Sequence, residues 1–187
     1  MGRSTSRFLY LEERIEIPEN VSVEISGRRV KVSGPKGSIE KDFSFARSVI
    51  IEKSGNEIIV KSYLGRSREK AIVRTIASRI RNMVRGVRGG YRYYLKIIFT
   101  HFPMNVSVED GKVVIRRILG GSDVRIAKIL EGVKVEIKDR DIIVEGVDLE
   151  AVSQTAANIE RAARITGFDK RVVMDGIYIY KREVIEG

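Results

Sequence analysis

Ile17-Pro18-Glu19-Asn20-Val21-Ser22-Val23-Glu24 returns 85 residues later as Phe102-Pro103-Met104-Asn105-Val106-Ser107-Val108-Glu109. Six of the eight positions are identical, and the first position is apolar in both copies. This interval is far longer than one unit of a stacked repeat array, so each copy can hold a small domain of its own. The sequence therefore predicts one fold duplicated in tandem, in residues 1–89 and 90–187.

Hydrophobic periodicity predicts the same kinds of element in both copies. Alternation over residues 21–26 and 30–32, with a turn at Gly27, predicts a hairpin with one buried face. Residues 67–88 change to helical spacing, and a second helical pattern follows Asp148, a suitable N-cap. We expect an α+β fold in which each domain packs one helix on a small antiparallel sheet. Residues 1–12 are predicted to be an arm that becomes ordered only on contact with another molecule.

Charge indicates the class of partner. The chain has 187 residues, with 35 Lys and Arg against 25 Asp and Glu, a formal net charge of +10. Such an excess favours polyanions, nucleic acid first and an acidic membrane surface second. No apolar run approaches membrane-spanning length, and residues 1–7 lack the apolar core of a secretory signal. We therefore expect a cytoplasmic protein without a membrane partner.

The strongest chemical signal lies on the helix predicted over residues 67–88. Its apolar positions, such as Ile76 and Ile80, gather on one side. Five cations lie on the opposite side and are called the basic ridge: Lys70, Arg74, Arg81, Arg85 and Arg88. Cations on successive turns can neutralise phosphates along a nucleic acid. Glu69 is the only acid between Arg66 and Arg92, which favours phosphate binding over a solvated face balanced by acids elsewhere in the fold.

Aromatic residues beside cations give a second, weaker signal. Tyr91-Arg92-Tyr93-Tyr94 and Tyr178-Ile179-Tyr180-Lys181-Arg182 could stack bases while a cation holds the backbone. Alternating aromatics in a strand are more often core residues or cross-strand pairs, and we prefer that interpretation. Gly34-Pro35-Lys36-Gly37 could offer backbone amides to a phosphate, but it is more simply a turn.

Enzymatic interpretations are poor. The chain has no cysteine, and His101 is its only histidine, so a cluster of histidine or thiolate metal ligands is excluded. A Ser-His-Asp arrangement would depend entirely on His101, for which a structural role is the better interpretation. We predict no catalytic residue, no metal, no cofactor and no small-molecule substrate. A nucleic-acid-processing enzyme is the rival hypothesis.

Several segments, in their order and spacing, resemble one known family. They are residues 32–37, 74–78, 82–87, 90–93, 101–106 and 145–148, Lys170-Arg171, and residues 175–178. Together they are similar to the sixth protein of the large ribosomal subunit, in its archaeal and eukaryotic branch, over nearly the whole chain after the first dozen residues. The resemblance implies a duplicated α+β fold. The bacterial branch has a glycine- and lysine-rich segment near the tail that is missing here.

The resemblance also implies a function. A member of this family would bind large-subunit rRNA near the base of the lateral stalk and the sarcin-ricin loop, close to the subunit interface and the factor-binding region. It would stabilise rRNA tertiary structure beside neighbouring large-subunit proteins. The second domain would supply much of the contact through the tail around Lys170, Arg171, Asp175, Gly176 and Tyr178, whereas the basic ridge points to the first domain. Both sites stay open, and an RNA- or DNA-binding protein outside the ribosome is the alternative.

The expected rRNA-binding residues combine the ridge, the tail and other cations. Most such contacts position a protein without reading sequence, so specificity would come from RNA shape. The set is Lys70, Arg74, Arg81, Arg85, Arg88, Arg92, Arg116, Arg117, Arg125, Lys128, Lys170, Arg171, Asp175, Gly176, Tyr178, Lys181 and Arg182.

Overall fold

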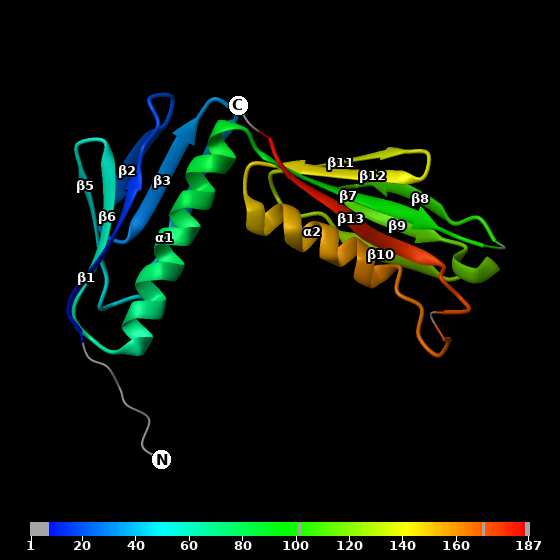
Figure 1. Ribbon diagram of the computed structural model, residues 1–187. Helices are drawn as coiled ribbons and strands as arrows, with labels where there is room; N and C mark the ends of the chain where they lie inside the picture. Colours follow the sequence, from blue (N-terminus) through cyan, green and yellow to red (C-terminus); the bar gives the residue numbers. More distant parts are fainter. Residues whose placement is uncertain (1–7, 101, 170, 186–187) are drawn as a thin grey trace, which may run out of the picture. The chain divides into compact units, whose positions relative to one another are not determined.

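The computed structural model describes residues 8–100, 102–169 and 171–185 (Figure 1). The predicted arm in residues 1–7, His101 and Lys170 therefore lie outside the described residues. The chain divides into two compact units at the bond between Gly89 and Gly90. Each unit is described by itself.

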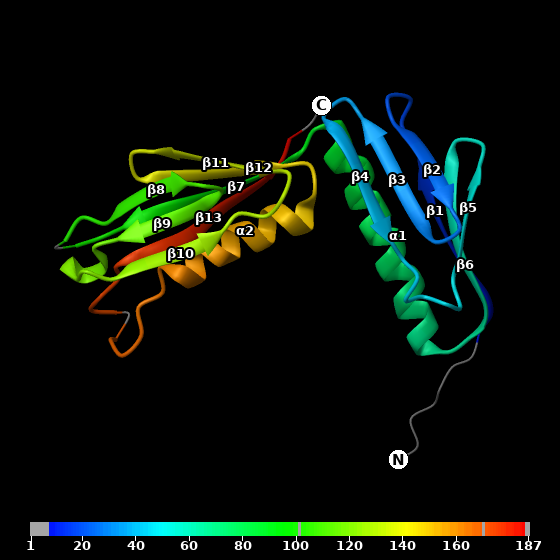
Figure 2. The same cartoon turned by 180° about the vertical axis from the view of Figure 1, so that it is seen from behind.

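The first unit contains six strands followed by one helix. They are β1 (Phe8–Glu16), β2 (Ser22–Ser26), β3 (Arg29–Gly34), β4 (Gly37–Asp42), β5 (Ile50–Ser54), β6 (Glu57–Gly65) and α1 (Ser67–Arg88). The strands form two antiparallel sheets, with orders β1-β6-β5 and β2-β3-β4 (Figure 2). The helix contacts both sheets, through β1 and β6 on one and β3 and β4 on the other. Buried Val32, Ile58 and Ile76 join the three layers into one core.

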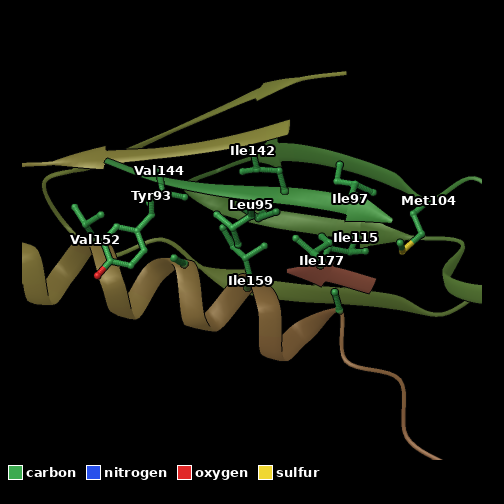
Figure 3. Close-up of a cluster of buried hydrophobic side chains, with 14 of the residues drawn as sticks. Tyr93, Leu95, Ile97, Met104, Ile115, Ile142, Val144, Val152, Ile159 and Ile177 are labelled. Atoms are coloured by element: carbon green, nitrogen blue, oxygen red, sulfur yellow. The ribbon is translucent and has the colours of Figure 1, made fainter. Parts of the chain in front are cut away.

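The second unit repeats this order and adds a final strand. Its elements are β7 (Tyr91–Ile98), β8 (Asn105–Glu109), β9 (Lys112–Arg116), the 3-10 helix η1 (Ile118–Gly120), β10 (Val124–Lys128), β11 (Val133–Lys138), β12 (Asp141–Gly146), α2 (Leu149–Ala162) and β13 (Gly176–Val184). The sheets have orders β10-β9-β8 and β11-β12-β7-β13. Leu95, Ile142 and Ile159 lie at the centre of the core between these sheets and α2 (Figure 3).

The two units share one topology, as the repeated sequence predicted. Sheet β1-β6-β5 corresponds to β7-β12-β11, and sheet β2-β3-β4 corresponds to β8-β9-β10. The expected class, a duplicated α+β fold with one helix in each copy, is confirmed. The structure differs in giving each unit two small sheets where the sequence suggested one. Only β13, among the strands of the described residues, has no counterpart in the first unit.

Two strands were not predicted. Residues 8–12 were expected to be ordered only on contact with another molecule, but they form the first half of β1 and pair with β6, Tyr10 opposite Tyr63. That expectation is wrong for residues 8–12 because it considered this short apolar patch by itself, whereas pairing with a strand about 50 residues away along the chain supplies the order. Strand β10 was also missed, and it pairs with β9 along its whole length.

The turn at Gly34-Pro35-Lys36-Gly37 packs against the last turn of α1. Lys36 donates its backbone N–H to the carbonyl oxygen of Val87 at 2.9 Å, so it satisfies one of the carbonyls that a helix end leaves free. A Cβ added to Gly34 would lie 2.7 Å from the same oxygen. Only glycine fits this approach, which joins the β3–β4 turn to the helix.

Candidate nucleic-acid interface

The basic ridge lies on the solvent side of α1. The helix begins where Glu69 accepts a hydrogen bond from the backbone N–H of Arg66 at 2.8 Å, and Gly89 ends it. Val73, Ile76 and Ile80 are buried against the sheets. The ridge cations are exposed except Arg81, which is half-buried. The amphipathic pattern thus presents one row of cations to solvent over about five turns.

The structure adds an acid to this row that local sequence did not reveal. Glu13 of β1 points toward α1, and its Oε2 accepts a hydrogen bond from Nη2 of Arg81 at 2.9 Å. Its Oε1 lies 3.6 Å from Nε of Arg74. The ridge is therefore partly neutralised at its middle, although Glu69 is the only acid within the helix.

The other three ridge cations are different. Within the described part of the chain, the side chains of Lys70, Arg85 and Arg88 make no hydrogen bond or ion pair with another residue. We call them the unpaired ridge cations. A phosphate could bind them without first displacing an internal carboxylate, so they are the ridge residues best suited to nucleic acid.

Four predicted contact residues of the second unit are held by carboxylates. Arg92 bonds Glu145 through Nε at 3.0 Å and Nη2 at 2.8 Å. Arg116 bonds Glu109 at 2.7 and 2.9 Å and lowers the pKa of that carboxyl to about 2. Two further cations are also ion-paired, Lys181 with Glu183 at 2.5 Å and Arg171 with Asp169 at 2.7 Å. Exposed pairs of this kind are worth little, so a phosphate can compete for the cation.

The remaining cations of the second unit have separate environments. Arg125 of β10 is half-buried, and its Nη1 donates to the carbonyl oxygens of Ala162 at 3.2 Å and Arg164 at 2.7 Å. It thus satisfies carbonyls at the end of α2. The guanidinium of Arg182 lies 5.6 Å from the ring centre of Tyr93. Arg117 and Lys128 are exposed.

Three of the predicted tail residues, Asp175, Gly176 and Tyr178, line a cleft beside the end of α2, whereas Arg171 does not. The volume of this cleft is about 460 Å³, and α2 and the segment after it contribute Glu160, Arg161, Arg164 and Phe168. Asp175 is 4% exposed, and its Oδ1 accepts a hydrogen bond from the backbone N–H of Thr100 at 3.0 Å. This bond fixes the start of β13 beside the end of β7.

Gly176 and Tyr178 are also positioned by packing. Gly176 has a φ of 156°, and a Cβ there would lie 3.1 Å from the hydroxyl oxygen of Tyr178. Asp175, Gly176 and Tyr178 therefore shape the cleft, while Arg161, Arg164 and exposed Phe168 offer the chemistry of RNA contact. The predicted set of contact residues did not include Arg161, Arg164 or Phe168. The signal that could have found them is two arginines three residues apart at the end of a helix, followed by an aromatic.

The aromatic segments are divided between core and surface. Tyr91 and Tyr93 are buried, so they form core contacts and cannot stack on bases. Tyr94 and Tyr180 lie side by side on the other face of the sheet, with ring centres 6.1 Å apart. Tyr180 is 56% exposed and Tyr178 is half-buried in the lining of the cleft, so the tyrosines of these segments that can stack on bases are Tyr94, Tyr178 and Tyr180.

Two other kinds of site are absent from the described residues. The described residues contain no group of three or more His, Cys, Asp or Glu side chains placed to hold a metal ion. None of the helices in this part of the chain is long and apolar enough to cross a membrane.

Comparison with known proteins gives the family. The sequence profile described as Ribosomal protein L6 matches residues 17–90 and again residues 102–176. Large ribosomal subunit protein uL6 of Aeropyrum pernix is 54% identical over 177 residues, covering 95% of this chain and 97% of the relative. The protein of the same name from Saccharolobus solfataricus is 53% identical over 96% of this chain and 99% of the relative. That from Methanothrix thermoacetophila is 42% identical over 90% and 96%. With both units matched and archaeal relatives similar over nearly its full length, the chain belongs to the ribosomal protein L6 family, in its archaeal branch.

Proposed function

We propose that this protein is a structural, non-enzymatic component of the large ribosomal subunit that binds large-subunit rRNA. The chain matches relatives named as large-subunit proteins over almost their whole length, and this match supports its assembly into the large ribosomal subunit. The observation that carries RNA binding is the row of unpaired ridge cations, Lys70, Arg85 and Arg88, on the solvent side of α1. In the cell the protein would act in the cytoplasm as part of the ribosome, beside other large-subunit proteins.

The proposed location is the base of the lateral stalk and the sarcin-ricin loop, near the subunit interface. Two surfaces would contact RNA there. The ridge would neutralise phosphates, and the cleft beside α2 would use Arg161, Arg164 and Phe168. Because two rigid units each hold one segment of rRNA, they would fix the placement of RNA helices and so stabilise its tertiary structure.

A salt titration tests the ridge. In the full chain, Lys70, Arg85 and Arg88 are replaced by glutamine, and the affinity for large-subunit rRNA is measured against salt concentration. A matched control replaces Arg14, Arg29 and Lys138, three exposed cations paired with Glu12, Asp42 and Glu136. Both triples remove the same charge.

The two triples are expected to differ. The ridge variant should lower the slope of log K against log salt by about 2 to 3, since each lost phosphate contact removes about 0.7 to 0.9. The control should change it by less than about 1. Equal losses in both variants would show that net charge alone drives binding and would reject the ridge.

Two further measurements test location and the alternative. Footprinting of rRNA in reconstituted large subunits should show protection near the sarcin-ricin loop, and protection confined to distant rRNA would contradict the proposed site. Co-sedimentation of the native protein with large subunits at high salt is expected. A protein that remains free under these conditions would instead fit RNA or DNA binding outside the ribosome.

A further inference from the structure

The final strand shows which edge of the first unit lacks a partner. In the second unit, β13 pairs antiparallel with β7 and covers the edge of that sheet (Figure 1). In the first unit the strand that corresponds to β7 is β1, which lies at the edge of sheet β1-β6-β5. No strand of the described residues pairs with the free side of β1. The duplicated fold therefore has one such edge covered and the other open.

Backbone geometry shows that the two edges are equivalent. Ile97 donates its N–H to Arg140 O at 2.8 Å at one end of the β7–β12 ladder, and Ile17 donates to Asn56 O at 2.9 Å at the same place beside β1 and β6. Hydrogen-bonded pairs alternate in an antiparallel ladder, so every second residue of β1 turns its backbone groups away from β6. These residues are Tyr10, Glu12, Arg14 and Glu16.

The exposed side chains of β1 fall into two halves. The second half carries exposed Arg14 and Glu16 and half-buried Glu12, which pairs with Arg14 at 2.8 Å, and charges at an edge limit which strands can pair there. The first half is apolar and open, with Leu9 79% exposed and Tyr10 47% exposed. Tyr10 lies against Tyr63, which is 53% exposed, with ring centres 5.3 Å apart. A long edge strand with an open apolar half is a place where another strand binds.

Strand β13 shows how a partner covers such an edge. Its Ile177 is 1% exposed and packs into the core beside Ile97, whereas Lys181 and Glu183 pair with each other on the outer side. An added strand thus hides apolar surface and satisfies the edge backbone at the same time.

We propose that an extended segment of a neighbouring large-subunit protein adds to the free edge of β1 as a further strand. The segment pairs antiparallel, as β13 does with β7, and places apolar side chains over Leu9 and Tyr10. A protein backbone suits this edge better than RNA, because alternating N–H and C=O groups match another strand and because Arg14 is already paired with Glu12, which leaves Glu16 as excess negative charge. The partner is taken from the large subunit, so this inference rests on the proposed function.

Photocross-linking in assembled subunits tests the edge. A photoreactive amino acid replaces Arg14 in the full chain, and a matched control carries it at Glu40, an exposed position on β4 away from this edge. Large subunits assembled with each variant are purified and irradiated. The Arg14 position is expected to cross-link to one segment of one ribosomal protein, and the Glu40 position is not expected to reach that segment.

Hydrogen exchange supplies a readout that needs no substitution. In the unmodified chain, amides of residues 9–16 should exchange at least about tenfold more slowly in the assembled subunit than in the free protein, because a paired edge opens rarely. Unchanged exchange would overturn the inference, as would cross-links from Arg14 only to rRNA or to a second copy of this chain. If the chain fails to join large subunits at all, the proposed function itself fails, and co-sedimentation distinguishes the two results.

Discussion

Arginine residues of this chain that are chemically alike lie in different surroundings. Arg85 and Arg88 face solvent without a carboxylate partner among the described residues, while Arg92 and Arg116 are each held by a glutamate at two nitrogens. A phosphate that binds Arg85 or Arg88 displaces no carboxylate and gains the full attraction of the cation. A phosphate that binds Arg92 or Arg116 must compete with the glutamate already in place. The same residue type therefore carries different weight in RNA binding.

Arg125 provides a test at the scale of one residue. Arg125→Ala should lower the free energy of unfolding by about 1 to 2 kcal/mol, because two carbonyl oxygens at the end of α2 lose their donor. The rRNA affinity of the folded variant should stay close to that of the parent chain. Urea denaturation and a binding titration at one salt concentration check the two statements.

Arg125→Lys is the control, since it keeps the charge but its side chain is one bond shorter, so the ammonium falls short of the place that Nη1 occupies between the two oxygens. It should be destabilised nearly as much as the alanine variant. A large loss of affinity in Arg125→Ala without loss of stability would instead support the phosphate contact that the sequence predicted.

The site could be predicted only as far as its local pattern. Helical spacing correctly kept the five ridge cations off the buried face of α1, although Arg81 is half-buried against β1. It could not show that Glu13 meets Arg81, because these residues are 68 positions apart and meet only when β1 docks against α1. Likewise, Tyr93 and Tyr94 are neighbours in sequence, and only the docking of α2 decides that Tyr93 is the buried one.

At the scale of elements, the contact between the β3–β4 turn and α1 makes a sharp prediction. Gly34→Ala should destabilise the first unit by about 1 to 3 kcal/mol, because the new Cβ would lie 2.7 Å from Val87 O and 2.9 Å from its Cγ2. Gly27→Asn is the matched control. Gly27 has a φ of 61°, which asparagine tolerates, and open space around it.

Circular dichroism is used to follow unfolding in urea, and the urea midpoint of each variant is compared with that of the parent chain. Gly27→Asn should shift the midpoint little. If Gly34→Ala were as stable as the parent, the turn would not be clamped to the helix in solution.

Elements with strong local signals were predicted well, and those that depend on distant partners were not. The spacing of apolar residues predicted a helix over residues 67–88, and α1 is Ser67–Arg88. Strand β10 was missed because Val124-Arg125-Ile126-Ala127-Lys128 is short, follows a glycine-rich loop and leaves Val124 and Ile126 exposed. Among the strands of the described residues it pairs with β9 alone, and that pairing decides its conformation.

At the scale of the whole molecule, duplication explains both the likeness of the units and their difference. In the part of the chain that the structure describes, each unit repeats six strands and a helix, yet the ridge occurs on α1 and not on α2, and the added strand lies beside β7 and not beside β1. The proposed roles follow this division. The first unit would supply phosphate contacts and an open edge, and the second would supply the cleft beside α2.

Separate cores predict that the units unfold as separate bodies. Ile177 of β13 is 1% exposed in the core of the second unit, so Ile177→Ala should cost about 2 to 5 kcal/mol there. It should leave the first unit unchanged, because its buried neighbours all belong to residues 90–187. Gly34→Ala should have the reverse effect. Hydrogen exchange at rising urea, followed in peptides from β3 and from β12, reports the two units separately. A shift of both peptides in either variant would show that the units unfold together, and the boundary at Gly89 and Gly90 would then not separate two independent folding domains.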